Sequence, residues 1–321
     1  MHAVRRLTGE ERPLLSVVLC TYNRARMAER ALLSVCRQSL RRDRYEIIVV
    51  DNNSRDETAD RIAAVQARYP DVVYVKELKQ GLSHARNRGF AESSGDYVLY
   101  MDDDAIAPSE YLETVARLLH QYAPDILGGP IYPFYVLPKP RWFRDDWEIR
   151  RYAAESGFAL KGGISGSNFV IRRPWLERIG MFDPALGMKG SEMRLGEDRQ
   201  ALETYRALVP EAEQRVYYAL EAPMLHLVPA MKMQLGYMLR RHFAAGRLKV
   251  TVKGTARTWS ALGISLTQLP GKVCRKHLNL VRDGWAGVDV VEAVRRTVFE
   301  LGVVYEGFRF NLGLREGRDR P

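Results

Sequence analysis

Short, wholly apolar runs alternate with longer stretches of helical periodicity through the first part of the chain. The runs at 14–20, 45–50, 72–75 and 97–101 predict buried strands, because they are too short for buried helices and are bounded by polar residues. Between them, apolar residues recur at the helical period, as in Ala28, Ala31, Leu32, Val35 and Cys36. Strands alternating with helices indicate right-handed βαβ units. The sequence therefore predicts an α/β fold with a mostly parallel central sheet.

Polar clusters directly follow three of these strands, at 21–24, 51–54 and 102–104. In a parallel sheet, ligands bind at the carboxyl ends of the strands, so these clusters should line one rim. Asp102, Asp103 and Asp104 are three adjacent carboxylates, which repel one another and gain nothing from apolar packing. A cation would explain them, and hard oxygen ligands suit Mg²⁺ or Mn²⁺. The alternative is a solvated acidic turn, which the shared rim makes less favourable.

Beyond residue 130 the pattern is less regular. The segment 134–152 is rich in aromatic residues and proline and is long for a loop, which is typical of functional loops. Glu197 and Asp198 open a predicted helix, and a strand at 216–220 precedes His226. Acidic residues are favoured in the first turn of any helix by its dipole, so the acidic pair alone does not indicate a function.

Charge is concentrated at the end of the 321-residue chain. Residues 231–321 hold 17 basic and 7 acidic residues, which accounts for the whole net charge of +10. The three cysteines have no CxxC spacing, which favours a reducing compartment over disulfides or a zinc site. No window resembles a signal peptide or a spanning helix. We expect a basic leader (1–13), an α/β domain (14–232) and a basic, mainly helical C-terminal extension (233–321).

A series of motifs in a fixed order resembles glycosyltransferase family 2 enzymes of the GT-A fold. The motifs are SVVLCTYNR, IIVVDNNSRDET, GLSHARNRG, YVLYMDDDA, GSNFVIRR, IGMFD and GEDRQAL, followed by a strand and His226. The resemblance covers residues 14–230. It implies a Rossmann-like nucleotide-diphospho-sugar transferase that inverts the anomeric centre and uses a divalent metal, Mn²⁺ or Mg²⁺. UDP-sugars are the commonest donors, and the acceptor would be a hydroxyl of a glycan or of a lipid-linked sugar in cell-surface polysaccharide or glycoconjugate biosynthesis.

The same resemblance assigns the metal site. Asp104 would ligate the metal directly, and Asp102 and Asp103 would hold the ribose or metal-bound water, with Asp102 also counted at the metal. His226 would complete the site, since neutral imidazole is a suitable ligand. The alternative for His226 is a hydrogen-bonded histidine of the core.

For the nucleotide, the resemblance assigns the base and ribose to Thr21, Tyr22, Asn23 and Asp51. Asp51 could instead be a turn residue that caps the next helix. Arg86 would pair with the donor diphosphate, a contact that suits a guanidinium group. The alternatives are that Arg88 does so, or that both arginines lie on a solvated helix face.

For catalysis, the resemblance makes a carboxylate of the GED motif the general base that deprotonates the acceptor. We assign the base to Asp198, with Glu197 as the second candidate. Adjacent residues on a helix point about 100° apart, so sequence does not separate them. Asn168, Trp142 and Trp147 could contact the acceptor, although buried aromatic residues more often belong to the core.

The basic extension favours a surface role. Cationic and apolar residues through 233–282 suit an anionic membrane, so we expect a cytoplasmic protein held peripherally on the cytoplasmic face of the membrane. The alternatives are a helical cap with solvated charges, or docking of an anionic polymer. Outside catalysis, a non-catalytic sugar-nucleotide binder or a basic nucleic-acid-binding protein remain as rivals. No nucleic-acid recognition motif is found, so no nucleic acid is expected.

Overall fold

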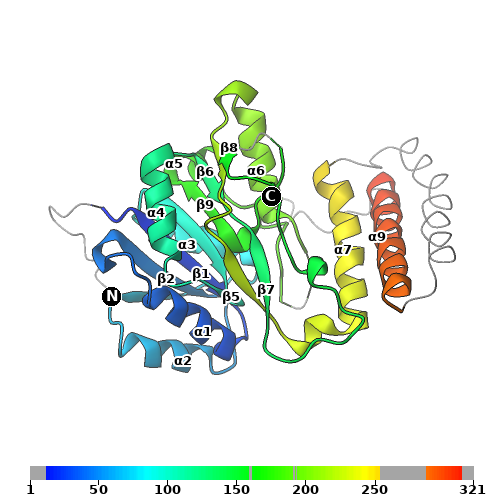
Figure 1. Ribbon diagram of the computed structural model, residues 1–321, viewed down its shortest axis with the longest axis horizontal. Helices are drawn as coiled ribbons and strands as arrows, with labels where there is room; N and C mark the ends of the chain where they lie inside the picture. Colours follow the sequence, from blue (N-terminus) through cyan, green and yellow to red (C-terminus); the bar gives the residue numbers. More distant parts are fainter. Residues whose placement is uncertain (1–11, 159–160, 191, 193, 254–286, 313–321) are drawn as a thin grey trace.

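The computed structural model describes residues 12–158, 161–190, 192, 194–253 and 287–312. Within them, the central element is an eight-stranded sheet in the order β3-β2-β1-β4-β9-β6-β10-β8 (Figure 1). Its strands are β1 Leu15–Thr21, β2 Tyr45–Asp51, β3 Val72–Lys76, β4 Tyr97–Asp102, β6 Ile126–Gly128, β8 Gly157–Phe158, β9 Phe169–Arg172 and β10 Val216–Tyr218. The first four are mutually parallel, whereas β9 runs antiparallel to β4 and β6. The prediction of a mostly parallel α/β sheet is confirmed.

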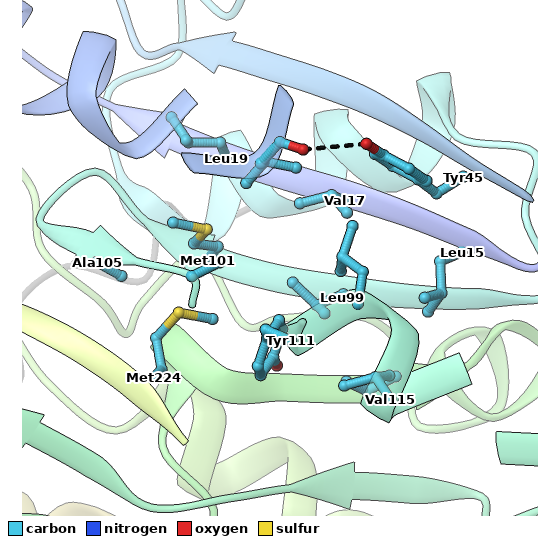
Figure 2. Packing of buried hydrophobic residues seen from close by; sticks show 14 of the residues in the cluster. Leu15, Val17, Leu19, Tyr45, Leu99, Met101, Ala105, Tyr111, Val115 and Met224 are labelled. Carbon is cyan, nitrogen blue, oxygen red and sulfur yellow. Dashed lines mark hydrogen bonds between the residues drawn. The ribbon is translucent and has the colours of Figure 1, made fainter. Parts of the chain in front are cut away.

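Helices cover both faces of this sheet, which explains why its strands read as continuous apolar runs. The helices are α1 Ala25–Cys36, α2 Thr58–Gln66, α3 Leu82–Glu92, α4 Tyr111–Tyr122, α5 Arg173–Arg178 and α6 Glu197–Leu208, with short 3-10 turns η1 Arg42–Arg44, η2 Asp145–Trp147, η3 Gly166–Asn168 and η4 Glu211–Glu213. Successive residues of β1 point to opposite faces. Val17 packs in the core that contains α1, α2 and α4 residues, and Val18 packs in the core that contains α3, α5 and α6 residues. Figure 2 shows the first of these cores.

A second, three-stranded sheet brings distant segments to the rim. Its order is β5-β11-β7, with β5 Ala105–Ile106, β7 Ile131–Tyr135 and β11 Met224–Val228. Because β11 is antiparallel to β5, His226 lies opposite Ala105. The histidine is thereby placed beside the end of β4, far from it in sequence.

The C-terminal part forms a helical pair beside the α/β body (Figure 1). A 3-10 turn, η5 Ala230–Met233, leads from β11 into α7 Leu235–Lys253, which packs against α9 Gly287–Asn311. The two helices approach closely because each carries a glycine at the contact: a Cβ at Gly246 would lie 2.0 Å from the Phe299 carbonyl oxygen. Of the helices in the described ranges, none combines the length and apolar character that a membrane crossing requires. Residues 1–11 of the basic leader and 254–286 of the extension lie outside the described residues, and the predicted domain boundaries stay predictions.

Candidate active site

A cavity of about 220 Å³ lies at the carboxyl ends of β1 and β4. In the register of the sheet, Thr21 pairs with Asp51 and Cys20 pairs with Asp102, so the ends of β1, β2 and β4 are level. The lining residues come from this rim, from α3, β11, η5 and α7, and from irregular segments between them: Cys20, Thr21, Tyr22, Arg24, Asn52, Gln80, Leu82, Ala85, Asp102, Asp103, Asp104, Arg150, Met188, Gly190, Leu195, His226, Lys232, Tyr237 and Arg241. The predicted convergence of the three polar clusters on one edge therefore holds.

Asp103 and Asp104, two buried carboxylates of this site, both contact Arg24. Arg24 Nη1 lies 2.9 Å from Asp103 Oδ1 and 3.2 Å from Asp104 Oδ2. Asp103 also accepts a hydrogen bond of 2.9 Å from Thr21 Oγ1. Burial raises the pKa of Asp103 to about 6, against the opposing charge of Arg24. Burial would also raise the pKa of Asp104, but Lys232 and His226 hold it well below its usual range.

Asp104 meets His226 and Lys232 on its other side. The main-chain N–H of Leu227 donates to the Asp104 carbonyl oxygen at 2.6 Å, which fixes β11 beside the aspartate. His226 Nε2 then lies 3.2 Å from Asp104 Oδ1. Lys232 Nζ lies 2.7 Å from Asp104 Oδ2 and 2.8 Å from His226 Nε2. Because a lysine ammonium group only donates, Nε2 must accept, and the ring proton is therefore on Nδ1.

Glu148 lies behind this histidine. Its Oε2 is 3.8 Å from His226 Nδ1, and its Oε1 accepts a hydrogen bond of 2.5 Å from Arg241 of α7. Glu148 Oε2 and His226 Nδ1 are buried and have no hydrogen-bond partner among the described residues. The negative charge of the carboxylate at this distance favours a proton on Nδ1, which leaves the Nε2 lone pair for the Lys232 ammonium group. Burial lowers the pKa of His226, so its ring is neutral at neutral pH.

Asp104 and His226 fit a divalent cation, whereas Asp102 contacts Arg86 instead. The separation of 3.2 Å between Asp104 Oδ1 and His226 Nε2 is near the roughly 3 Å between adjacent ligands on an octahedral ion of about 2.1 Å bond length. Within the described ranges, no group of three or more His, Cys, Asp or Glu side chains has metal-binding geometry. A metal here would have two protein ligands, and its other ligands would be water or phosphate oxygens.

Arg86 joins the first carboxylate cluster to the second. Its guanidinium is buried, and it donates to Glu197 Oε1 at 2.7 Å and to Asp102 Oδ1 at 3.1 Å. A glycine makes room for it, because a Cβ at Gly166 would lie 2.6 Å from Arg86 Nη2. Burial raises the pKa of Glu197 to about 7, with Arg86 opposing and Asp198 reinforcing the shift.

Asp198 is half-buried and is held by the main chain. Its Oδ2 accepts the Gly166 N–H at 2.7 Å, and its Oδ1 accepts the Arg199 N–H at 2.7 Å. Arg150 lies in the adjacent cavity wall and donates to Ser165 Oγ at 2.8 Å. The two adjacent acids therefore differ: Glu197 pairs with a buried arginine, whereas the hydrogen bonds that Asp198 accepts from described residues come from main-chain N–H groups.

The residues predicted to hold the nucleotide divide into two groups. Thr21 and Tyr22 line the cavity. Asp51 accepts the Ser54 N–H at 2.8 Å and the Tyr74 hydroxyl at 2.6 Å, and Asn23 Oδ1 accepts the Arg55 N–H at 2.8 Å. These two side chains fix the loops of the rim. Asn52 and Gln80 take their place in the cavity wall.

The three residues predicted as possible acceptor contacts are packed or hydrogen-bonded within the protein. Asn168 is fully buried and accepts a hydrogen bond of 2.6 Å from the Tyr111 hydroxyl. Trp142 and Trp147 pack around Phe143 in a small core.

Sequence reasoning missed several residues of the cavity wall. Arg24 belongs to the polar cluster predicted on the rim, but nothing in the sequence pairs it with the aspartates. Lys232, Tyr237 and Arg241 lie in a segment whose many basic residues look alike, and Arg150 lies in an irregular loop. The one sequence signal for Lys232 is its position six residues after His226. That spacing does not predict a contact, because the two residues do not share a helix or a strand.

The mostly parallel sheet, with a buried carboxylate cluster at the carboxyl ends of its strands, is shared by known proteins. Two solved structures share the fold. Mannosyltransferase PcManGT from Pyrobaculum calidifontis, in complex with GDP-Man and Mn²⁺, has a TM-score of 0.58 and 18% identity over 95% of this chain and 89% of its own. S. aureus TarS 1-349, in complex with UDP-GlcNAc, has a TM-score of 0.54 and 14% identity over 88% of this chain and 90% of its own. The fold is that of the GT-A glycosyltransferases.

The sequence places the chain more narrowly. The model of glycosyl transferase family 2 matches residues 16–180, and the chain belongs to that family. It is 28% identical to glucosyl-dolichyl phosphate glucuronosyltransferase of Haloferax volcanii, over 73% of this chain and 76% of that protein. It is 23% identical to the succinoglycan biosynthesis protein ExoM of Rhizobium meliloti, over 73% of each. The protein is a glycosyltransferase, as the motifs predict.

Proposed function

We propose that this glycosyltransferase moves a sugar from a nucleotide diphosphate donor to a hydroxyl group of a glycan or lipid-linked acceptor, with inversion of the anomeric centre. UDP-sugars are the first donors to test. The observation that carries the proposal is the pair of carboxylate centres, Asp102–Asp104 and Glu197–Asp198, joined through Arg86 beside one cavity. The names of the relatives, which include a dolichyl phosphate substrate and succinoglycan biosynthesis, support an acceptor of cell-surface polysaccharide or glycoconjugate biosynthesis.

Donor binding would use the rim and its cations. Thr21 and Tyr22, with Asn52 and Gln80, are placed to contact the nucleoside, and Asn23 and Asp51 shape the loops that present them. Asp104 and His226 would hold Mn²⁺ or Mg²⁺, which when bound acts as a Lewis acid on the diphosphate. Support for a metal comes from the Mn²⁺ named in the complex of the similar mannosyltransferase.

The diphosphate contacts are best assigned to cations that line the cavity, Arg24 and Lys232. Arg86 donates to Glu197 and Asp102 and is not among the lining residues. We therefore propose a positioning role for Arg86, which holds the two acids in place, rather than direct contact with the donor. The cations neutralise charge that grows on the leaving diphosphate, which is the main electrostatic demand of the reaction.

Proton removal from the acceptor is assigned to Asp198. Its main-chain hydrogen bonds fix its carboxylate, and it is more exposed than Glu197. Attack by the deprotonated hydroxyl on the face opposite the diphosphate gives a single displacement and inverts the centre. Glu197 remains the second candidate, because a base works best with a pKa near the operating pH.

Substitution of the base tests this mechanism. Asp198→Asn should lower kcat by about 10²–10⁴-fold, the usual contribution of a general base, and leave donor affinity unchanged. Single-turnover transfer and calorimetric titration of the donor measure the two effects separately. Glu197→Gln is the matched variant. Turnover of Asp198→Asn equal to that of the parent would assign the proton transfer elsewhere.

A lipid-linked acceptor requires a surface that meets the membrane. Five large apolar side chains are 44–53% exposed near the ends of β7 and β11: Phe134, Val136, Leu137, Met231 and Leu235. We call them the apolar tip. Exposed Arg30 of α1 and Arg37, which directly follows that helix, line the groove beside Phe134, and Lys139 and Arg141 come later in the sequence. Apolar side chains flanked by cations suit an anionic lipid surface.

This proposed surface differs from the one predicted at 233–282, of which residues 254–282 lie outside the described residues. In the described part of that region, α7 packs against α9 and carries cavity residues Tyr237 and Arg241. Part of its surface is therefore already used for contacts within the molecule. We propose that the apolar tip, which includes Leu235 at the start of α7, makes the peripheral contact with the cytoplasmic face of the membrane.

A further inference from the structure

Lys232 occupies a position that its sequence surroundings do not explain. It lies in η5, between two methionines of opposite exposure: Met231 is exposed, and Met233 is buried against Phe143 and Val228. Its side chain is 8% exposed. A lysine is rarely buried unless it is paired, and this one points its ammonium group at Asp104 and His226.

The ammonium nitrogen lies between the two side chains that would bind a metal ion, in contact with Asp104 Oδ2 and His226 Nε2. A divalent ion bound to Asp104 and His226 would be about 2.1 Å from each ligand atom, and Lys232 Nζ is already within 2.8 Å of both side chains. Two cations at that spacing would repel strongly inside a buried site. The lysine and a metal therefore exclude one another at this pair.

The surroundings of Lys232 allow it to leave. Lys232 borders the cavity, and so do three other side chains able to bind phosphate oxygens: Arg24, Tyr237 and Arg241. A lysine has a flexible stem with four carbons, so the ammonium group can move by several ångströms without a change in the main chain. A diphosphate in the cavity would offer it new acceptors.

We propose that Lys232 is the resident cation of the Asp104–His226 pair in the donor-free enzyme, and that a metal–diphosphate complex displaces it onto the diphosphate. The inference rests on the proposed donor class. It adds that Lys232 leaves the pair when the metal and the diphosphate bind. Metal alone must expel the lysine and leaves its charge without a partner carboxylate. Metal with nucleotide supplies further ligands for the ion and a new anion for the lysine. Metal and nucleotide therefore bind with positive coupling, which is reciprocal.

Titration of Mn²⁺ by electron paramagnetic resonance tests the exchange without measuring transfer. Wild-type protein should bind Mn²⁺ at least about tenfold more tightly with saturating UDP than without it, a coupling of ordinary size. Lys232→Met should bind Mn²⁺ alone at least about tenfold more tightly than wild type, because the competing cation is gone. Lys76→Met, an exposed lysine at the end of β3, is the matched control and should behave as wild type.

A second variant guards against misfolding. Lys232→Gln removes the charge and keeps a hydrogen-bonding group, so it should also strengthen binding of Mn²⁺ alone, and circular dichroism melting reports its fold. Equal affinity of wild type and both Lys232 variants for Mn²⁺ alone would overturn the proposal. So would UDP binding that is unaltered by removal of metal.

The Mn²⁺ titrations without nucleotide test the position of Lys232 independently of the proposed donor class. If the Lys232 variants gain Mn²⁺ affinity while no nucleotide alters it, the lysine occupies the metal position but the exchange with donor is overturned. Failure of the proposed function itself would show instead as an absence of transfer from any sugar nucleotide in the wild type.

Discussion

At the scale of single residues, adjacent carboxylates have different chemistry because they have different partners. Asp103 pairs with Arg24 and Thr21, and burial brings its pKa to about 6. Asp104 pairs with Lys232 and His226, which keep it ionised far below neutral pH. Burial and a like charge bring the pKa of Glu197 to about 7, whereas Asp198 is fixed by main-chain N–H groups. The local environment, not the residue type, sets each role.

The pKa of Glu197 predicts a pH dependence of stability. Its folded value of about 7 lies above the ordinary 4.5, so protonation favours the folded state. This contribution is complete below about pH 4.5 and is lost as the pH rises through 7. Glu197→Gln should remove it and flatten the fall in free energy of unfolding between pH 5 and pH 8 by roughly 2–3 kcal/mol.

Urea denaturation at both pH values measures the difference. Glu177→Gln, on the exposed end of α5, is the control and should leave the profile as it is in wild type. The pKa of Asp103 is raised as well, so this carboxyl also makes stability fall with rising pH. Both variants retain Asp103, so its contribution cancels in the comparison. An identical pH profile for Glu197→Gln and wild type would show that the carboxyl of Glu197 titrates normally.

At the scale of elements, short turns and a short strand position the side chains of the candidate site. The 3-10 turn η3 sets the Gly166 N–H against Asp198 and leaves space for the Arg86 guanidinium. The 3-10 turn η5 carries Lys232 back from β11 toward β4. The two-residue strand β5 aligns His226 with the residue after Asp104. These elements contribute little apolar burial, and their main role is to position the side chains of the site.

Gly166→Ala tests the close approach at η3. The new Cβ would lie 2.6 Å from Arg86 Nη2, so the guanidinium must move and its hydrogen bonds to Asp102 and Glu197 lengthen. Overpacking of this kind costs about 1–3 kcal/mol of stability. We also expect kcat to fall by about tenfold or more, because small displacements of catalytic groups have large effects.

Thermal melting and initial rates of transfer measure both effects. Gly236→Ala is the matched control, because an added Cβ there meets no neighbour within 4 Å and an alanine is favoured in a helix. A variant of Gly166 with wild-type rate and stability would show that Arg86 shifts without consequence for the acids.

At the scale of the whole molecule, a basic helical pair and a neutral α/β body share one site. Tyr237 and Arg241 of α7 line the cavity whose floor is formed by the body, and Arg241 pairs with Glu148. The apolar tip lies at the ends of β7 and β11, the two strands that lead into this region. The proposed membrane contact and the proposed donor site are thus connected through these strands.

The apolar tip predicts binding to anionic vesicles. The double variant Val136→Asp, Leu137→Asp places two charges on side chains that are 49% and 53% exposed, so folding should be unaffected. Its cosedimentation with phosphatidylglycerol vesicles should fall by about tenfold or more, since it loses apolar insertion and gains repulsion. Leu208→Asp, 55% exposed at the end of α6, is the control. Retained vesicle binding by the double variant would place the membrane contact elsewhere.

The sequence by itself determined the sheet, its rim and the acids on it. Short apolar runs and helical periodicity can be recognised within a few neighbouring residues. The carboxyl ends of parallel strands must then meet at one edge of the sheet. From this, the placement of Thr21 and Asp102–Asp104 on one rim could be predicted, and the motif order gave the family. These features depend on neighbours in the chain and on the handedness of the connections.

Only the tertiary structure decided which charges pair. Lys232 reaches Asp104 across 128 residues, and Arg86 reaches Glu197 across 111. No periodicity encodes such contacts, because they depend on the angle at which irregular turns return to the sheet. One basic residue among many in the C-terminal part is thereby selected for a buried position between a carboxylate and an imidazole, where a cation is required.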